Sequence, residues 1–423
     1  MLEEHLEGQE AALRQKAGSS LWHNRDYLLL LSGQAISSVG TQLSQFAFPL
    51  LIFAITGSSA WAGAASGLVL VPYLILSLPA GALIDRWDRK RAMILCDIGR
   101  ALVLASIPVA LFFGRLTLVQ LCIAALCEGT CYVFFDIAEV ASIPQVVSRA
   151  QLPKATAQKG TVLNIAYTAG PLLGGTLFAL GRAIPFLADA VSYMISVLSL
   201  RLIKCDFQAG RSEASGNLWV EIQQGLSWLW RKPLIRFLAL MASVGNGIDN
   251  AILIFFIVVL SRQHASPAVI GLGYMLAGAA GVLGSYLSER VVKRVPFGVF
   301  TIVTQVATLC LLALYFIAQN IVGIILITTV LTFFSALQGM VQWAYRAALI
   351  PDELQGRVNS VFRLIAYASP PLFMALTGLL LQVNTAVTVL VLTVIVGVVT
   401  VMAVLNTHVR HAPAFGSEEG VTY

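Results

Sequence analysis

Long apolar stretches follow one another through most of the sequence, from residue 28 to residue 405. A helix needs about 20 apolar residues to cross a hydrocarbon core of about 30 Å. Only 11% of the residues are charged, whereas soluble globular proteins have about 25%. The sequence therefore predicts an all-α membrane protein with twelve transmembrane helices. They are expected at 28–55, 61–83, 92–113, 116–140, 161–180, 184–202, 237–260, 268–287, 299–318, 320–345, 362–381 and 383–405.

Basic residues gather in alternate connecting segments. Of the 27 lysines and arginines, 23 lie on the side of the N-terminus, three lie on the other side, and Arg100 lies inside the third stretch. Because cytoplasmic loops carry the excess of Lys and Arg, both termini are expected in the cytoplasm of a multi-pass protein of the plasma (inner) membrane. The net charge of +6 is then a topological signal, and no nucleic acid is expected as a partner.

The motifs of common enzyme sites are missing from the sequence. It has no Gly-Lys-Ser or Gly-Lys-Thr phosphate loop, no Cys-x-x-Cys pair and no histidine inside an apolar stretch. We therefore expect no enzyme activity, no catalytic residues, no metal and no bound cofactor. Energy for transport would then come from an ion gradient, with the proton gradient as the expected source.

The chain repeats itself after about 200 residues. Ile165–Leu172 matches Ile365–Leu372 at an offset of 200, and Gly81–Arg91 matches Gly284–Arg294 at an offset of 203. Parallel six-helix repeats build one large class of secondary transporters, with the substrate site between the halves near the midplane. The repeat predicts six-helix bundles at 27–203 and 235–405, a cytoplasmic linker at 204–234, and cytoplasmic tails at 1–26 and 406–423.

The linker contains an amphipathic pattern. Its apolar residues recur at helical spacing, namely Leu218, Trp219, Ile222, Leu226 and Leu229. This pattern predicts a helix that lies on the cytoplasmic membrane surface, acting as a tether or in regulation.

Several motifs carry a resemblance to a known family. Gly81-Ala-Leu-Ile-Asp85-Arg86-Trp87-Asp88-Arg89-Lys90-Arg91 resembles the loop signature between helices 2 and 3 of the major facilitator superfamily. Ala169–Gly175, which includes Gly170 and Pro171, resembles its helix-5 motif in exporters. His23–Tyr27, Phe134–Ala138 and Leu187–Tyr193 are similar to one branch, which contains the enterobactin exporter and macrolide-efflux proteins. The resemblance extends over essentially the whole chain. It implies two pseudo-symmetric six-helix bundles, transport by alternating access, and a cavity lined by helices 1, 4, 7 and 10.

The sequence departs from the family pattern at two places. Asp88 stands where the broad signature has glycine, although this branch often has Asp there. Helix 4 contains no arginine, so the arginine-centred motif of some drug–proton antiporters is absent.

The motif residues also have a physical interpretation, with Gly81, Asp85, Arg86, Arg89, Lys90, Gly170 and Pro171 as the conformational-switch candidates. The basic residues anchor the end of helix 2 at the anionic membrane surface. Asp85 is placed to cap a helix or to pair with the other half, in a contact that breaks as the halves rock. Topology-setting charge explains the loop equally well, and helix packing explains the glycine and the proline.

Carboxylates within the apolar stretches are functional candidates, because ionisable groups at membrane depth are costly. Glu128 and Asp249 are expected near the midplane, and Asp136 and Glu139 toward the cytoplasmic end of helix 4. We predict these four as proton-coupling residues, in the order Glu128, Asp249, Asp136 for the first three. Asp97 and Arg100 are expected to pair with one another, since they are three residues apart on a helix.

Uncharged polar residues form stripes at helical spacing in helices 1, 7 and 10. The substrate-cavity candidates among them are Gln34, Ser38, Thr41, Gln45, Asn246, Asn250, Gln338 and Gln342. Hydrogen bonding between helices would explain the same stripes without a substrate.

Taken together, the residues predict a secondary active transporter that exports amphiphilic small molecules of the drug, macrolide or siderophore type, driven by proton entry. A carboxylate in a low-dielectric cavity can exchange a proton for a substrate as the halves rock. An importer or uniporter of a small solute is the nearest alternative, because the helices do not encode direction. A non-transporting sensor or scaffold is disfavoured, because the tails are too short for a soluble domain. The expected partners are the substrate and the lipid bilayer, with a monomer as the functional unit.

Overall fold

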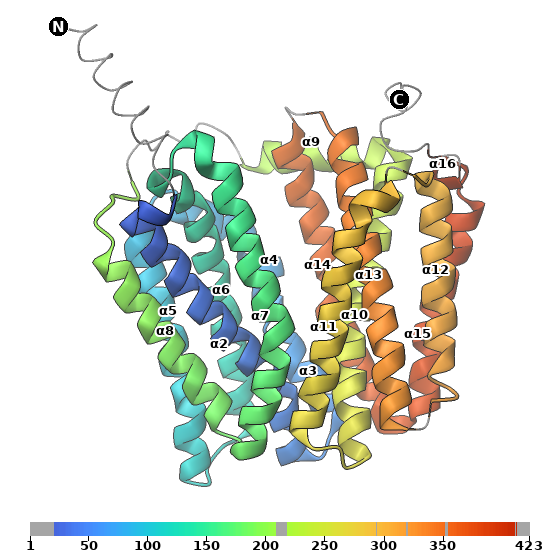
Figure 1. Cartoon of the computed structure of the whole chain (residues 1–423), viewed down its shortest axis with the longest axis horizontal. Helices are drawn as coiled ribbons and strands as arrows, with labels where there is room; N and C mark the ends of the chain where they lie inside the picture. The colour runs from blue at the N-terminus through green and yellow to red at the C-terminus, as the bar shows by residue number, and fades with distance from the viewer. Residues whose placement is uncertain are drawn as a thin grey trace, which may run out of the picture. The chain divides into compact units, whose positions relative to one another are not determined.

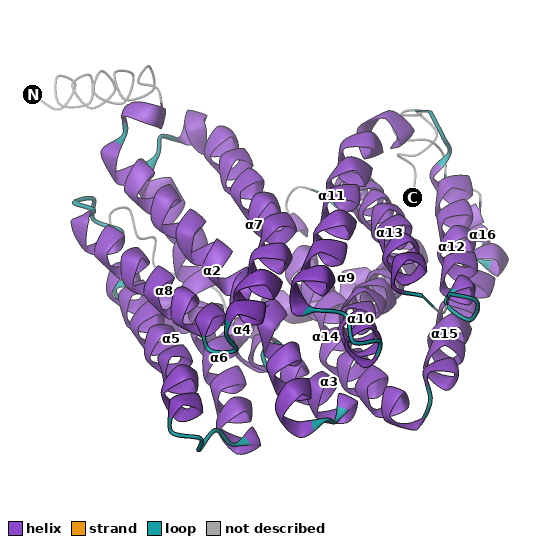
Figure 2. Cartoon of the chain, turned by 60° about the horizontal axis from the view of Figure 1, so that its bottom comes forward, coloured by secondary structure: helices purple, strands orange, loops and turns teal. Residues whose placement is uncertain are grey.

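The computed structural model describes residues 21–208, 218–292, 294–318, 320–351, 354–410 and 412. In this part of the chain the regular elements are helices (Figure 2). They are η1 (Leu21–His23), α2 (Arg25–Thr56), α3 (Ser59–Gly67), α4 (Val71–Ile84), α5 (Arg89–Phe112), α6 (Leu118–Val146), η2 (Arg149–Gln151), α7 (Leu152–Leu180), α8 (Ile184–Leu202), α9 (Leu218–Arg231), α10 (Pro233–Arg262), α11 (Pro267–Val292), α12 (Phe297–Leu314), α13 (Ile321–Leu349), α14 (Gln355–Val383), α15 (Thr385–Leu405) and α16 (Thr407–Arg410).

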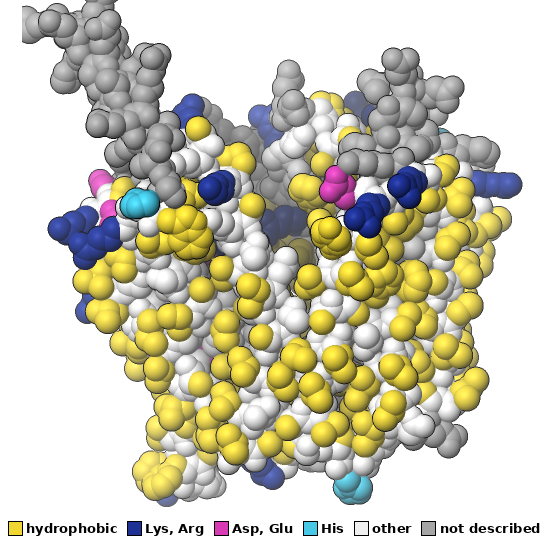
Figure 3. All heavy atoms as spheres, in the orientation of Figure 1, with side chains coloured by type: hydrophobic (Ala, Val, Ile, Leu, Met, Phe, Trp, Pro, Cys, Tyr) yellow, Lys and Arg dark blue, Asp and Glu magenta, His cyan; other side chains and the backbone are white. Residues whose placement is uncertain are grey.

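Twelve helical segments within the described ranges are long and apolar enough to cross a membrane. One of them, Ser59–Ile84, combines α3 and α4. The helices carry many exposed apolar side chains, among them Leu95, Leu102 and Phe112 of α5. Figure 3 shows apolar side chains over the flanks of the helices and basic side chains near helix ends. The twelve predicted spans of an all-α membrane protein are therefore confirmed.

Short polar residues fix where several helices begin. The side chains of Thr117, Asn320 and Asn384 accept backbone N–H bonds at the N-termini of α6, α13 and α15. Such caps satisfy amide groups that lack a partner in the first turn. At the other end of α5, Gly114 has a φ of 63°, a conformation that favours glycine. The helix boundaries thus follow local sequence signals.

The chain divides into two compact units (Figure 1). Unit 1 contains residues 1–47, 71–170 and 180–214, and unit 2 contains 48–70, 171–179 and 215–423. Two segments of the first sequence half, 48–70 and 171–179, therefore group with the second half. The bundle boundaries expected from the repeat stay a prediction, and the tail residues 1–20 and 413–423 lie outside the described residues.

In unit 1, α5 packs against α6 and α8, and α4 packs against α6. Its core includes the fully buried residues Ile84, Met93 and Ala138. Gly170 at the middle of α7 lies against Gln42 of α2, where a Cβ atom would clash. Small size at this position is therefore needed for close packing of the two helices.

In unit 2, α10 packs against α14 and α11 packs against α13, and the views in Figures 1 and 2 agree with this arrangement. Glycines bring two further helix pairs into backbone contact. Gly63 of α3 meets Gly378 of α14, and Gly175 of α7 meets Gly271 of α11. These contacts attach the two segments from the first sequence half to unit 2.

The predicted linker helix is present as α9. Leu229 is fully buried against the core of unit 2, while Leu226 and Trp230 are exposed. Gly225 of α9 lies against the backbone of Arg357 in α14. The helix is therefore packed on unit 2, and its contact with a membrane surface stays a prediction.

Candidate functional site

A cavity of about 610 Å³ lies within unit 2, between α10, α12, α13, α14 and α15. Its volume falls in the range of sites for drug-sized ligands, roughly 300–1,000 Å³. The wall combines apolar residues such as Ile248 and Leu331 with a set of polar ones. The uncharged polar residues of the wall include Asn246, Gln305, Ser335, Gln338 and Gln342.

Asp249 is the acidic residue of this wall. It lies near the middle of α10 and is half-buried. The Ser335 hydroxyl of α13 lies 2.8 Å from one of its carboxylate oxygens and 2.7 Å from the other. No ion pair joins Asp249 to a basic residue in the described part of the chain. The carboxylate is thus held by a hydroxyl group and faces the cavity without a cationic partner.

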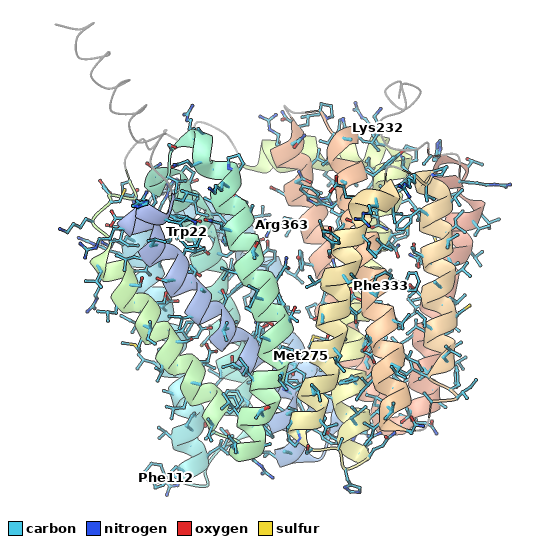
Figure 4. All side chains as sticks on the ribbon, in the orientation of Figure 1. Trp22, Phe112, Lys232, Met275, Phe333 and Arg363 are labelled. Atoms are coloured by element: carbon cyan, nitrogen blue, oxygen red, sulfur yellow. The ribbon has the colours of Figure 1, made fainter. Side chains whose placement is uncertain are left out.

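Two arginines also line the cavity. Arg346 belongs to α13 and is buried, and Arg363 belongs to α14 and is exposed. Figure 4 labels Arg363. Arg346 lies one residue beyond the predicted span 320–345, and Arg363 is the second residue of the predicted span 362–381. The polar stripe was the signal that could have found Arg346, because Gln338, Gln342 and Arg346 follow at four-residue spacing on one face of α13.

Three of the predicted cavity residues of unit 2 line the cavity, namely Asn246, Gln338 and Gln342. Asn250 is absent from its wall and donates a hydrogen bond to the carbonyl of Asn246. Asn246 itself donates to the Ala366 carbonyl of α14 at 3.1 Å. Interhelical hydrogen bonding therefore accounts for part of this stripe, as the alternative interpretation allowed.

Unit 1 contains a buried cluster of charged residues from α5, α6 and α8. Arg100 donates to Oε1 of Glu128 through Nε at 2.9 Å and through Nη2 at 2.6 Å. Its guanidinium also lies 4.0 Å from the ring centre of Tyr193. Arg100 is 4% exposed and Glu128 is 6% exposed. The two charges therefore compensate each other in a buried site.

Two more carboxylates complete this cluster. Asp97 lies 3.9 Å from Nη1 of Arg100, and neither of its oxygens has a hydrogen-bond partner in the described chain. Asp189 accepts hydrogen bonds from Ser44 of α2 and from Ser192. Both carboxylates are fully buried. One arginine thus lies among three carboxylates, and two of these have no cation at hydrogen-bonding distance.

Glu128 is not an isolated carboxylate at membrane depth, because it is the main ion-pair partner of Arg100. The predicted Asp97–Arg100 pair exists, but only as the longer contact. The sequence could not show this, since Arg100 and Glu128 lie 28 residues apart on different helices. The proton-coupling role of Glu128 stays a prediction.

The other two carboxylate candidates lie further along α6. Glu139 is buried and pairs with Lys159 of α7 at 2.9 Å. Asp136 is half-buried on the same helix. A role of either residue in proton coupling stays a prediction, and Glu139 also ties α6 to α7.

The candidate residues of helix 1 have different surroundings. Thr41 belongs to the buried cluster, where its hydroxyl lies 2.8 Å from the Tyr193 hydroxyl. Gln34 is buried, Ser38 is half-buried and Gln45 is exposed. Contact of these residues with a substrate stays a prediction.

The loop signature holds unit 1 together around the start of α5. Arg89 donates to the Ala141 carbonyl of α6 at 2.9 Å, and Lys90 donates to the Ile203 carbonyl after α8 at 2.6 Å. Asp85 forms a 3.8 Å ion pair with Arg89. Asp88, which replaces the usual glycine, accepts from the Arg91 N–H and caps α5. The motif therefore has a structural function, and its switch role stays a prediction.

The remaining motif positions show few contacts. Arg86 is exposed, and a Cβ atom added at Gly81 would meet open space. Among the described residues, no group of three or more His, Cys, Asp and Glu side chains could hold a metal ion.

Curated relatives of this chain include named efflux pumps. Multidrug efflux pump Tap of Mycolicibacterium fortuitum is 27% identical over 83% of this chain and 88% of that protein. Macrolide efflux protein A of Streptococcus pyogenes is 24% identical over 48% of this chain and 51% of that protein.

Solved transporter structures share the fold at low sequence identity. A bacterial homologue of the iron transporter ferroportin in an inward-facing state has a TM-score of 0.70 at 16% identity, over 92% of this chain and 100% of that chain. A bacterial homologue of the human lysosomal transporter Spinster, in an inward-facing and unoccupied conformation, has a TM-score of 0.73 at 14% identity, over 91% and 98%.

A family model completes this comparison. The Major Facilitator Superfamily model matches residues 30–373, which is most of the chain. Twelve spans, the loop signature and the structural neighbours agree with that match. The chain is a multi-pass membrane transporter and belongs to the Major Facilitator Superfamily.

Proposed function

We propose that the protein exports amphiphilic small molecules from the cell in exchange for protons, with Asp249 as the coupling carboxylate. One observation carries this proposal. Asp249 lies in the wall of a drug-sized cavity, bonded to Ser335 and without a basic partner among the described residues. Carboxylates at membrane depth are costly and mark ion and proton pathways.

The coupling follows from competition for one carboxylate. The ionised Asp249 attracts a basic nitrogen of a bound substrate, and the protonated form does not. Proton binding and substrate binding then oppose each other, and a bound ligand shifts the conformational equilibrium by its preference for one state. Exchange of a proton for a substrate at Asp249 would therefore couple the proton flux to the substrate flux.

Glu128 is less suited to this role than Asp249. Protonation of Glu128 would leave Arg100 buried with only the longer contact to Asp97. Breaking a buried pair in this way is strongly unfavourable, by about 3–5 kcal/mol. Protonation of Asp249 breaks no ion pair among the described residues, so Asp249 replaces Glu128 as the first candidate for the proton-coupling residue.

The direction of transport is supported by the relatives. Two of them are named as multidrug or macrolide efflux proteins. The placement of 23 basic residues on one side of the membrane supports cytoplasmic termini. The protein would then take its substrates from the cytoplasm, across the plasma membrane, with the proton gradient as the energy source.

The test uses inverted membrane vesicles that are acidified inside, with rhodamine 123 as the transported dye. We expect the vesicles to accumulate the dye and to release protons in step with it. Asp249→Asn should reduce the dye-dependent proton flux about tenfold or more, as for loss of about 1.4 kcal/mol of coupling. The control is Asp206→Asn, because the carboxylate of this acid after α8 accepts only the backbone N–H of Gln208 among the contacts described for it.

Two results would contradict the proposal. An Asp249→Asn protein with undiminished proton flux would remove Asp249 from the coupling. Dye accumulation that appears only with the gradient reversed would identify an importer.

A further inference from the structure

The cavity of unit 2 carries opposite charges at two depths. Asp249 lies at the level of Ser335, near the middle of α10 and α13. Arg346 lies three residues before Leu349, the end of α13, in the last turn of that helix. Both side chains line the same cavity.

Arg346 lacks the acid partner that a buried arginine ordinarily has. It is 8% exposed, yet it forms no ion pair with a described carboxylate. Its Nε is buried without a hydrogen-bond acceptor in the described chain. Buried charges in proteins are paired, and a buried polar atom without a partner calls for an explanation. A ligand group that enters the cavity would supply both the charge and the acceptor.

The guanidinium of Arg346 is also held in a fixed position. It lies over the Phe362 ring of α14, 3.6 Å from the ring centre. This stacking covers one face of the guanidinium plane. The N–H groups at the rim of a guanidinium plane match the two oxygens of a carboxylate, which an arginine can bind in a bidentate manner. The arrangement is thus suited to a planar anionic group.

The two charges are separated by a distance that a small molecule can span. Ser335 and Arg346 are eleven residues apart on α13, which is about 16 Å along the axis. Helical side chains point back toward the N-terminus, so the guanidinium lies nearer to Ser335 than its Cα atom does. Gln338 and Gln342 fill the interval with hydrogen-bonding groups.

We propose that Arg346 is an anion-binding residue of the cavity and that the substrates include zwitterionic amphiphiles. Their carboxylate or other anionic group binds Arg346, and their basic nitrogen binds Asp249. This assignment rests on the proposed function, whose substrate class it narrows. It predicts that the protein recognises an acidic group that a purely cationic drug lacks.

Two dyes that differ at a single group test the assignment. Rhodamine 110 carries a free carboxylate, and rhodamine 123 is its methyl ester. Binding is measured by fluorescence on the full-length protein in nanodiscs of phosphatidylcholine. This lipid has no net charge, so no anionic lipid competes with the carboxylate of the dye. Arg346→Gln should raise the Kd of rhodamine 110 about tenfold, which corresponds to about 1.4 kcal/mol. The same change should alter the Kd of rhodamine 123 by less than about twofold.

Matched variants separate this effect from a general loss of charge or fold. Arg357→Gln removes an exposed arginine of α14 that bonds Gln224, and it should leave both dyes unchanged. Arg346→Lys keeps the charge without the planar fork and should give an intermediate Kd for rhodamine 110. Asp352 and Glu353 lie outside the described residues. Their joint replacement by Asn and Gln tests whether these acids compete with the dye for Arg346, and it should not strengthen rhodamine 110 binding.

Three outcomes would overturn the assignment. The first is that the wild-type protein does not bind rhodamine 110, and the second is that Arg346→Gln weakens the binding of both dyes equally or of neither. The third is that rhodamine 110 binds more strongly after Asp352 and Glu353 are replaced. In each case proton-driven export of rhodamine 123 would still be testable through Asp249. Loss of that export in the wild type, with selective dye binding intact, would instead count against the proposed function.

Anionic lipid is a second source of the same chemistry. Nanodiscs with added phosphatidylglycerol should weaken rhodamine 110 binding to the wild type only if a lipid headgroup reaches Arg346. That result would also support anion binding at Arg346, provided that Arg346→Gln abolishes the competition.

Discussion

Arg100 directs two of its nitrogens, Nε and Nη2, to the same oxygen of Glu128, at 2.9 Å and 2.6 Å. The Tyr193 hydroxyl donates to this oxygen as well, at 2.9 Å. Three donors thus converge on Oε1, while Oε2 has no partner among the described residues. Through this oxygen, Glu128 of α6 is hydrogen-bonded to both α5 and α8.

The first prediction concerns the stability of this pair. Glu128→Gln should lower the free energy of unfolding by about 3 kcal/mol, because Arg100 then loses its compensating charge in a buried site. Arg100→Gln should have a similar effect, and the double variant should recover part of the loss. Thermal unfolding of the purified protein measures all three. The control is Arg91→Gln, which removes an exposed pair with Asp88 and should cost less than about 1 kcal/mol.

A second prediction concerns Asp97 and Asp189, the two carboxylates of the cluster that have no cation at hydrogen-bonding distance. Asp189→Asn keeps the shape of the side chain and removes a charge that no arginine or lysine offsets at short range. We expect a change in unfolding free energy below about 1 kcal/mol, since uncompensated buried charge contributes no stability. Asp97→Asn should behave alike. If thermal unfolding showed that either change lowers the free energy of unfolding as much as Glu128→Gln does, this account of the charges in the cluster would be wrong.

A third prediction concerns the cap of α5. Asp88→Ala should destabilise unit 1 by about 1 kcal/mol, because the Arg91 N–H loses its acceptor. Asp88→Ser should retain most of the stability, since serine is an equally good N-cap. Thermal unfolding distinguishes the two variants. Equal stability of the Ala and Ser proteins would show that the cap does not contribute.

A fourth prediction concerns the backbone contacts made by glycine in unit 2. Gly63→Ala would place a Cβ atom against the Met374 carbonyl and Gly378 of α14. We expect a loss of about 1–3 kcal/mol, the usual effect of overpacking. Gly160→Ala in α7 is the matched control, because a Cβ atom there meets nothing within 4 Å. That control should be neutral or slightly stabilising, since alanine favours helix. Equal effects of the two changes would mean that the α3–α14 contact tolerates side chains.

Much of the fold was predictable from local patterns. Apolar stretches predicted the twelve spans because a bilayer imposes length and hydrophobicity on each helix separately. The linker helix α9 was likewise visible in its amphipathic spacing. Helix ends were less certain, and an error of four residues at the end of α13 was enough to place Arg346 outside the predicted span 320–345.

The candidate sites were less predictable because they depend on contacts between distant residues. Depth along a helix singled out Asp249, and the polar stripe of helix 10 singled out Gln338 and Gln342. All three line the cavity. Depth alone could not show that Glu128 faces Arg100, because pairing depends on how α5 and α6 are rotated against each other. It also gave no sign that Asp189 joins the same cluster from α8.

The glycine contacts of unit 2 also bear on how the chain could be divided. Residues 48–70 and 171–179 come from the first sequence repeat but pack within the second unit, through Gly63 against Gly378 and Gly175 against Gly271. A protein cut between Gln208 and Leu218 would therefore yield two fragments of which the second lacks part of its own unit. Neither fragment would be a self-sufficient module. Exchange of one repeat between related proteins would require compatible glycine contacts at Gly63–Gly378 and Gly175–Gly271 as well as a compatible linker.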